Sequence, residues 1–203
     1  MIGISVAIQS GAATAAMRRL MDQAANPAAM LKVVSRKGAN ELKTHFRMRN
    51  RTPNKLGGKR TNFWQRIADS VQNPVIVNPR LAQIEISDPT FAQKLFGGKI
   101  IAKNANKLTV PNHALAHGRT VAVFQHETGI KLFRIRKKGG VLTNLLAGIL
   151  NGALTVFYIL RDSVNQQADP NALPPQDAFE AALLSTANDY YARETARANA
   201  TAS

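Results

Sequence analysis

Histidine is the residue type whose spacing in this chain comes closest to a metal site. His113 and His117 are separated by three residues, and His126 follows them in the sequence. A zinc peptidase places a glutamate beside the first histidine of such a pair, but the segment HALAH contains no glutamate and has no acidic residue near it. We therefore interpret these side chains as surface histidines and predict no metal ligand among them.

Other catalytic signals are equally weak. The glycine-lysine segments at residues 57–60 and 97–99 lack the hydroxyl residue and the first glycine of a phosphate-binding loop. The twelve carboxylates are scattered. Apart from Glu85 in a predicted strand, Asp88 and Glu127 are the only ones in the central region, so the sequence shows no pair of acids that could act together in hydrolysis. No serine or histidine lies in a nucleophile-elbow context, and zero cysteines exclude thiolate chemistry. The sequence predicts a protein that is not an enzyme and has no cofactor.

Positive charge is the strongest compositional signal. The 203 residues carry a net charge of +15, which points to an acidic partner: nucleic acid, an anionic membrane surface or an acidic protein face. The charge is concentrated, because residues 32–66 contain eleven lysines and arginines against the single acid Glu41, and residues 131–138 contain five more. Within the first of these segments, residues 50–60 have the composition of an exposed basic loop.

The N-terminal part of the chain predicts a strand followed by helices. Apolar residues alternate over residues 2–8, which indicates a strand, and residues 12–25 are rich in alanine with apolar residues at helical spacing. Asn26 and Pro27 restart the helix, which we expect to run to about Arg49 with one apolar and one basic face.

The rest of the chain predicts antiparallel strands and a last helix. Short strands are expected at residues 75–77, 81–87, 107–110, 120–124 and 130–136. An extended connector is expected over residues 164–175, after which Asp177 caps a helix with an apolar stripe of Phe179, Leu183, Leu184, Ala187 and Tyr191. The predicted fold class is α+β, with an antiparallel sheet of about six or more strands packed with N- and C-terminal amphipathic helices. We expect one domain over residues 1–197 and a frayed tail over residues 198–203.

A long apolar hairpin is expected over residues 139–160. Asn151 and Gly152 form the commonest two-residue hairpin signal, and they separate two apolar runs, of which the second covers residues 153–160. Residues 141–160 are also long enough for a transmembrane helix, but Asn144, Asn151 and Thr155 would then lie in hydrocarbon. We favour a buried or interfacial β-hairpin and predict no membrane partner.

One longer motif links a short helical turn to a strand. Residues 91–111 read FAQKLFGGKIIAKNANKLTVP, in which paired glycines permit the helical turn to stop and the proline closes a strand. The motif resembles the signature of phage virion-morphogenesis proteins of the tail-completion type, with matching positions at Phe96, Gly97, Gly98, Leu108 and Pro111. The order of basic helices, antiparallel sheet with hairpin, connector and final helix is similar to that family over most of the chain.

The resemblance implies a structural virion protein of a tailed phage. Proteins of that family act at the neck as tail-completion or tail-terminator proteins, assembling as rings, commonly hexameric, that cap the tail tube and allow head-tail joining. It implies the tail tube and head-tail connector proteins as partners, and a place in the virion after synthesis in the host cytoplasm. The N-terminus agrees with synthesis there, because it shows no secretory signal pattern.

Two surfaces would serve such a ring. The apolar hairpin supplies sheet edges and apolar surface for contacts between subunits, and the interface residues that we expect are Leu145, Leu146, Ile149, Leu150 and Phe157. A ring around DNA would also use cations on loops, and the lumen-facing or DNA-facing residues that we expect are Arg47, Arg49, Arg51, Lys55, Lys59 and Arg60. These cations are equally consistent with a solvated face or with acidic virion neighbours. The alternative function is non-specific nucleic-acid binding through the basic N-terminal half.

Overall fold

A computed structural model of the chain describes residues 18, 21–22, 27–54, 56–58, 60–103 and 105–200. The strand expected over residues 2–8 lies outside this part of the chain, and so does most of the helix expected over residues 12–25. By its contacts the chain divides into two compact units. The helical unit comprises residues 1–45, 69–87 and 173–203, and the sheet unit comprises residues 46–68 and 88–172. The expectation of one domain over residues 1–197 stays a prediction.

The helical unit is built on two long helices. Helix α2 (Ala28–Arg51) begins directly after Pro27, as the sequence predicts, and its last residues belong to the sheet unit. Helix α6 (Gln176–Ala200) continues through residues 198–200, where the sequence predicted fraying. A Cβ on Gly38 would lie 3.1 Å from Ile84 and 3.4 Å from Leu183 and Phe179, so the missing side chain allows close packing of α2.

The apolar stripe predicted on α6 is only partly buried. Phe179 and Leu183 face Gly38 of α2, whereas Leu184 is 65% exposed. Strands β1 (Val75–Asn78) and β2 (Leu81–Gln83) form an antiparallel pair in the same unit. The first lies at its predicted position, whereas the second covers only the start of the strand predicted over residues 81–87.

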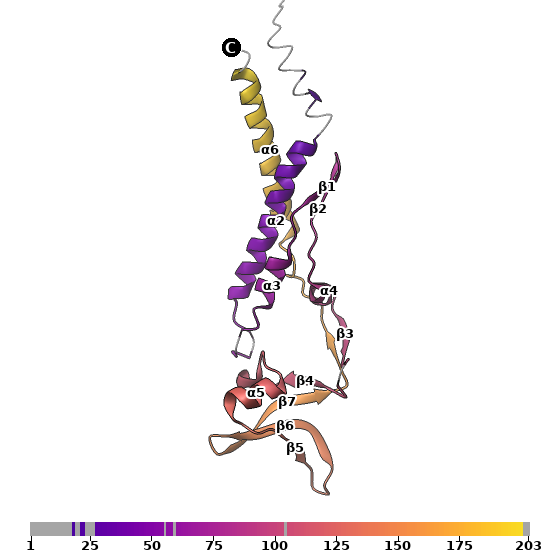
Figure 1. The fold of residues 1–203 in the computed structure, drawn as a ribbon, viewed down its shortest axis with the longest axis vertical. Helices are drawn as coiled ribbons and strands as arrows, with labels where there is room; N and C mark the ends of the chain where they lie inside the picture. Colours follow the sequence, from indigo (N-terminus) through magenta and orange to yellow (C-terminus); the bar gives the residue numbers. More distant parts are fainter. Residues whose placement is uncertain are drawn as a thin grey trace, which may run out of the picture. The chain divides into compact units, whose positions relative to one another are not determined.

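The sheet unit contains a four-stranded antiparallel sheet of order β4-β7-β6-β5. Its strands are β4 (Leu108–Pro111), β5 (Phe133–Arg136), β6 (Leu142–Leu150) and β7 (Ala153–Arg161). Strands β6 and β7 form the predicted hairpin (Figure 1), and Asn151 and Gly152 have φ values of 51° and 80°, as a type I′ turn requires. The fold class is α+β, as predicted. No helix in the described part of the chain could cross a membrane.

Helix α5 (Val121–Thr128) replaces the strand that the sequence predicted over residues 120–124. The Thr120 side chain accepts a hydrogen bond from the Val123 amide, and Gly129 ends the helix in the left-handed region at φ 70°. These two caps outweigh the β preference of the valines. The helix buries Phe124 against Phe157 and Tyr158 of β7, and Ala116 of the short 3-10 helix η1 (Ala114–Ala116) completes this core.

Two short helices of the sheet unit pack around an aromatic cluster. Helix α3 (Phe63–Ser70) places Trp64 against Phe46 of α2 with ring centroids 5.9 Å apart, and helix α4 (Pro89–Phe96) places Phe91 5.4 Å from the same ring. Strand β3 (Gly98–Ile101) pairs with β8 (Ser163–Gln166), so the segment predicted as an extended connector begins as a strand.

Candidate functional site

The Gly-Gly motif forms a tight junction between α4 and the β3-β8 pair. Asp88 caps α4 by accepting from the Thr90 amide, and Gly97 ends the helix at φ 71° and ψ −157°. A Cβ on Gly97 would lie 2.6 Å from both the Ala168 nitrogen and the Gln166 oxygen. The first glycine is therefore needed for its backbone conformation and for the close approach of another backbone segment.

The other motif positions lie in different structural environments. Phe96 is 77% exposed at the end of α4, and Gly98 opens β3 opposite Gln166. Leu108 and Pro111 are the first and last residues of β4, so the proline lies on an edge strand of the four-stranded sheet, where its missing amide costs least.

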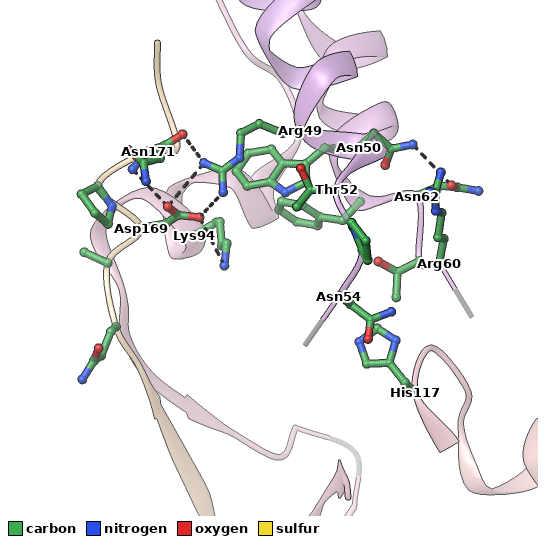
Figure 2. A pocket seen from close by; sticks show the side chains of 17 residues that line it. Arg49, Asn50, Thr52, Asn54, Arg60, Asn62, Lys94, His117, Asp169 and Asn171 are labelled. Atoms are coloured by element: carbon green, nitrogen blue, oxygen red, sulfur yellow. Dashed lines mark hydrogen bonds and ion pairs between the residues drawn. The ribbon is translucent and has the colours of Figure 1, made fainter. Parts of the chain in front are cut away.

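Arg49 is the centre of a polar cluster in the sheet unit (Figure 2). Its guanidinium donates to both carboxylate oxygens of Asp169, at 2.8 and 3.3 Å, and to the Asn171 carbonyl. The same group lies 4.0 Å from the centroid of the Trp64 ring, and Lys94 Nζ lies 3.5 Å from Asp169 Oδ2. The sequence placed Arg49 among the DNA-facing cations, but its charge is already committed to a forked ion pair and an aromatic face. These contacts predict a structural role for Arg49.

The other predicted basic residues differ in their surroundings. Arg47 and Arg51 are exposed near the end of α2 and form no ion pair with a described residue. Arg60 is exposed and donates to the Arg51 carbonyl at 3.1 Å. Lys55 and Lys59 lie outside the described residues. An exposed cationic group of Arg47, Arg51 and Arg60 therefore remains from the predicted set.

An open cleft of about 760 Å³ lies beside the Arg49 cluster. Its lining includes Phe63, Trp64, Arg60, Lys94 and His117. The described residues contain no group of three or more acidic or histidine side chains that could hold a metal ion. His113 has a structural role, because its Nδ1 accepts from the Leu115 amide and its ring lies 5.2 Å from Phe157. The acid in its described lining, Asp169, is already paired with Arg49 and Lys94.

The predicted interface residues of the hairpin lie on two opposite faces of the sheet. Phe157 is fully buried, and Leu146 and Leu150 pack against the same core. A partner could not reach Phe157 without unfolding the core, so its predicted interface role does not fit this fold. Ile149 is 54% exposed and pairs in register with Leu154, which is 57% exposed.

The second face of the sheet is apolar, and we call it the outer face. Residues paired across an antiparallel ladder share a face, and the register places Leu145 opposite Ile159 and Phe133 opposite Ala147. The outer face is defined by Phe133, Leu145, Ile149, Leu154 and Ile159. Sequence reasoning missed Phe133 and Leu154, although their alternation with core residues in β5 and β7 was the available signal.

Removing the Arg49 side chain is expected to destabilise the sheet unit. Arg49→Ala leaves Asp169, whose side chain is 13% exposed, without its main partner and uncovers Trp64, so we expect the unfolding free energy to fall by about 2–3 kcal/mol. Urea denaturation measures the change. Arg47→Ala is the matched control, and its exposed side chain predicts a change within about 0.5 kcal/mol. Equal effects of the two variants would contradict the structural role of Arg49.

Stability is also expected to depend on the ionisation of Asp169. Burial acts to raise the pKa of Asp169, but the hydrogen bonds from Arg49 and the Asn171 amide, with the charges of Arg49 and Lys94, bring it below its ordinary value of 3.8. A lowered folded-state pKa contributes stability above pH 3.8 that is lost as the pH falls through the folded value. Urea denaturation between pH 7 and pH 3 should show this loss, with a weaker acid dependence in Asp169→Asn. An unchanged acid dependence in that variant would refute the assignment.

Comparison with family models, with curated proteins and with solved structures finds no match for this chain.

Proposed function

We propose that this protein is a structural virion protein of a tailed phage that acts at the neck as a tail-completion or tail-terminator protein. In this proposal it forms a ring, hexameric by resemblance, which caps the tail tube and allows head-tail joining. The resemblance in residues 91–111 supports the proposal from the sequence, and the outer face supports it from the fold. The protein has no enzymatic role and no cofactor in this proposal.

The outer face is the observation that carries the proposal. Three of its side chains, Phe133, Ile149 and Leu154, are each about half exposed, and they lie on neighbouring strands. Contiguous exposed apolar surface is characteristic of protein interfaces, and each of these half-exposed side chains gains about half of the roughly 1.5–3 kcal/mol of full burial when it is covered. Closed cyclic symmetry would cover this surface in every copy.

The assembly state of the purified protein tests the proposal. Light scattering over a concentration series, with negative-stain images of the same sample, should show rings of several subunits. The same measurement with added tail tubes covers assembly on a template. Monomers in both samples would contradict the proposal.

A second candidate function is non-specific nucleic-acid binding. The exposed cationic group of Arg47, Arg51 and Arg60 favours it, because these cations form no ion pair with a described residue and can attract phosphate. DNA affinity should then fall steeply with salt. An affinity that does not change with salt would remove this candidate.

A further inference from the structure

A second basic site lies in the helical unit, where a groove of about 520 Å³ runs between α2 and β1. We call it the α2-β1 groove. Lys32, Arg36 and Lys43 line it from the helix. The rest of its lining is uncharged, and consists of Ser35, Ala39, Asn40, Asn73, Pro74 and Ile76. Among the described residues, the groove lining therefore has three cations and no carboxylate.

The three cations form a row along one side of α2. Spacings of four and seven residues place Lys32, Arg36 and Lys43 on the same side of the helix. With a rise of 1.5 Å per residue, the row extends about 16 Å along the helix axis. Like charges in neighbouring turns repel each other by a few tenths of a kcal/mol per pair. An anion lying along the row would remove this repulsion.

The row has no internal counterions among the described residues. On the same helix, Lys37 pairs with Glu41 at 2.6 Å, whereas Lys32, Arg36 and Lys43 form no ion pair with a described residue. Helix α2 therefore neutralises some of its cations, and this row has no counterion within the part of the chain that the structure describes.

A second copy of this chain is poorly suited to fill the groove. The chain carries only 12 acidic residues against 27 lysines and arginines. Several of these acids already pair with cations of their own chain, namely Glu41, Asp88, Glu127, Asp162, Asp169 and Glu194. Each added copy also adds a charge of +15. A different, strongly anionic molecule suits the groove better than a second copy does.

We propose that the α2-β1 groove binds the sugar-phosphate backbone of nucleic acid without reading its sequence. One strand of DNA has a phosphate every 3.4 Å along the helix axis, so a row of about 16 Å runs beside four or five phosphates. Lysine, arginine and asparagine are typical phosphate-contacting side chains, and Asn40 and Asn73 stand beside the cations. This inference rests on the second candidate function and names a surface for it that is separate from Arg47, Arg51 and Arg60.

Fluorescence anisotropy of the full chain with a labelled duplex of mixed sequence tests the groove. The groove variant is Lys32→Gln, Arg36→Gln, Lys43→Gln, and glutamine keeps the helix propensity of these positions. We expect about a tenfold or greater loss of affinity at 100 mM salt, and a slope of log affinity against log salt that is smaller by about 2.7. Far-UV circular dichroism checks that the variant stays folded.

Two further triple variants remove the same charge elsewhere. One is Arg47→Gln, Arg51→Gln, Arg60→Gln, and the other is Arg134→Gln, Lys137→Gln, Lys138→Gln on and after β5. A loss of DNA affinity in the groove variant that is larger than the loss in the β5 variant supports DNA binding by the groove. Equal losses in all three would show an effect of net charge alone and overturn the inference.

The remaining outcomes separate the groove from the function on which it rests. DNA binding that is lost only in the Arg47, Arg51 and Arg60 variant would overturn the groove and keep the second candidate function. Absence of DNA binding by the unmodified chain would overturn both. Poly-glutamate, used as a probe of acidic protein, should bind more weakly than DNA; tighter binding that depends on the groove would overturn nucleic acid as its ligand.

Discussion

Replacing Gly97 with alanine is expected to lower the unfolding free energy of the sheet unit by about 3 kcal/mol or more. The added Cβ would lie 2.6 Å from two backbone atoms, the Ala168 nitrogen and the Gln166 oxygen, neither of which can rotate away as a side chain would. At φ 71° and ψ −157° the residue also occupies a region that is essentially restricted to glycine. Chemical denaturation of the variant measures the combined cost.

Gly57→Ala is the matched control for this prediction. Gly57 has the same φ of 71°, but no atom beyond its chain neighbours lies within 4 Å of its added Cβ, so the control contains the cost of a positive φ without the collision. We expect it to cost about 1–2 kcal/mol. If Gly97→Ala lowered the unfolding free energy no more than Gly57→Ala does, the result would contradict the close approach of the two backbone segments.

Local signals made much of the fold predictable. Pro27 marks the start of α2, and Asn151 and Gly152 mark the turn of the hairpin, because each residue acts through its own backbone angles. Helix α5 was predicted as a strand because its valines favour a strand, whereas the caps at Thr120 and Gly129 favour a helix. A pattern of apolar residues does not weigh these two preferences against each other.

Contacts between distant residues could not be predicted in this way. The pairing of β3 with β8 joins Gly98 to Gln166, and no local pattern specifies a partner so far along the chain. The same limit applies to Arg49, because its partner Asp169 lies 120 residues away. Without that partner in view, Arg49 was indistinguishable from the exposed cations Arg47 and Arg51.

The hairpin shows why the predicted interface residues fall on two faces of the sheet. The register shifts between Leu146 and Ala147, so that Leu146 pairs with Tyr158 and Ala147 pairs with Val156. Phe157 falls at this irregularity and is buried beside Tyr158, although strict alternation would place one of the two on the outer face. The predicted interface set therefore mixed core residues with exposed ones.

Ile149→Asp is expected to prevent assembly while leaving the fold intact. The Ile149 side chain is 54% exposed and lies on the outer face, so a carboxylate there remains hydrated in the monomer. In an assembled ring the same carboxylate would be buried against an apolar surface at a cost of several kcal/mol. We expect subunit association to weaken by about 100-fold or more. Sedimentation velocity over a concentration series measures the shift, and circular dichroism reports the fold.

Two comparison variants connect the loss of assembly to the outer face. Val123→Asp changes a valine of α5 that is 43% exposed. The buried neighbour Phe124 lies against the opposite face of the sheet, so this variant should leave assembly unchanged. Leu154→Asp, which faces Ile149 across the hairpin, should reproduce the loss. Normal rings from both Ile149→Asp and Leu154→Asp would show that subunits meet elsewhere. The cost of the new carboxylate arises only when it is buried in the ring. Loss of assembly in these two variants, with a stable monomer, therefore distinguishes an interface from a folding defect.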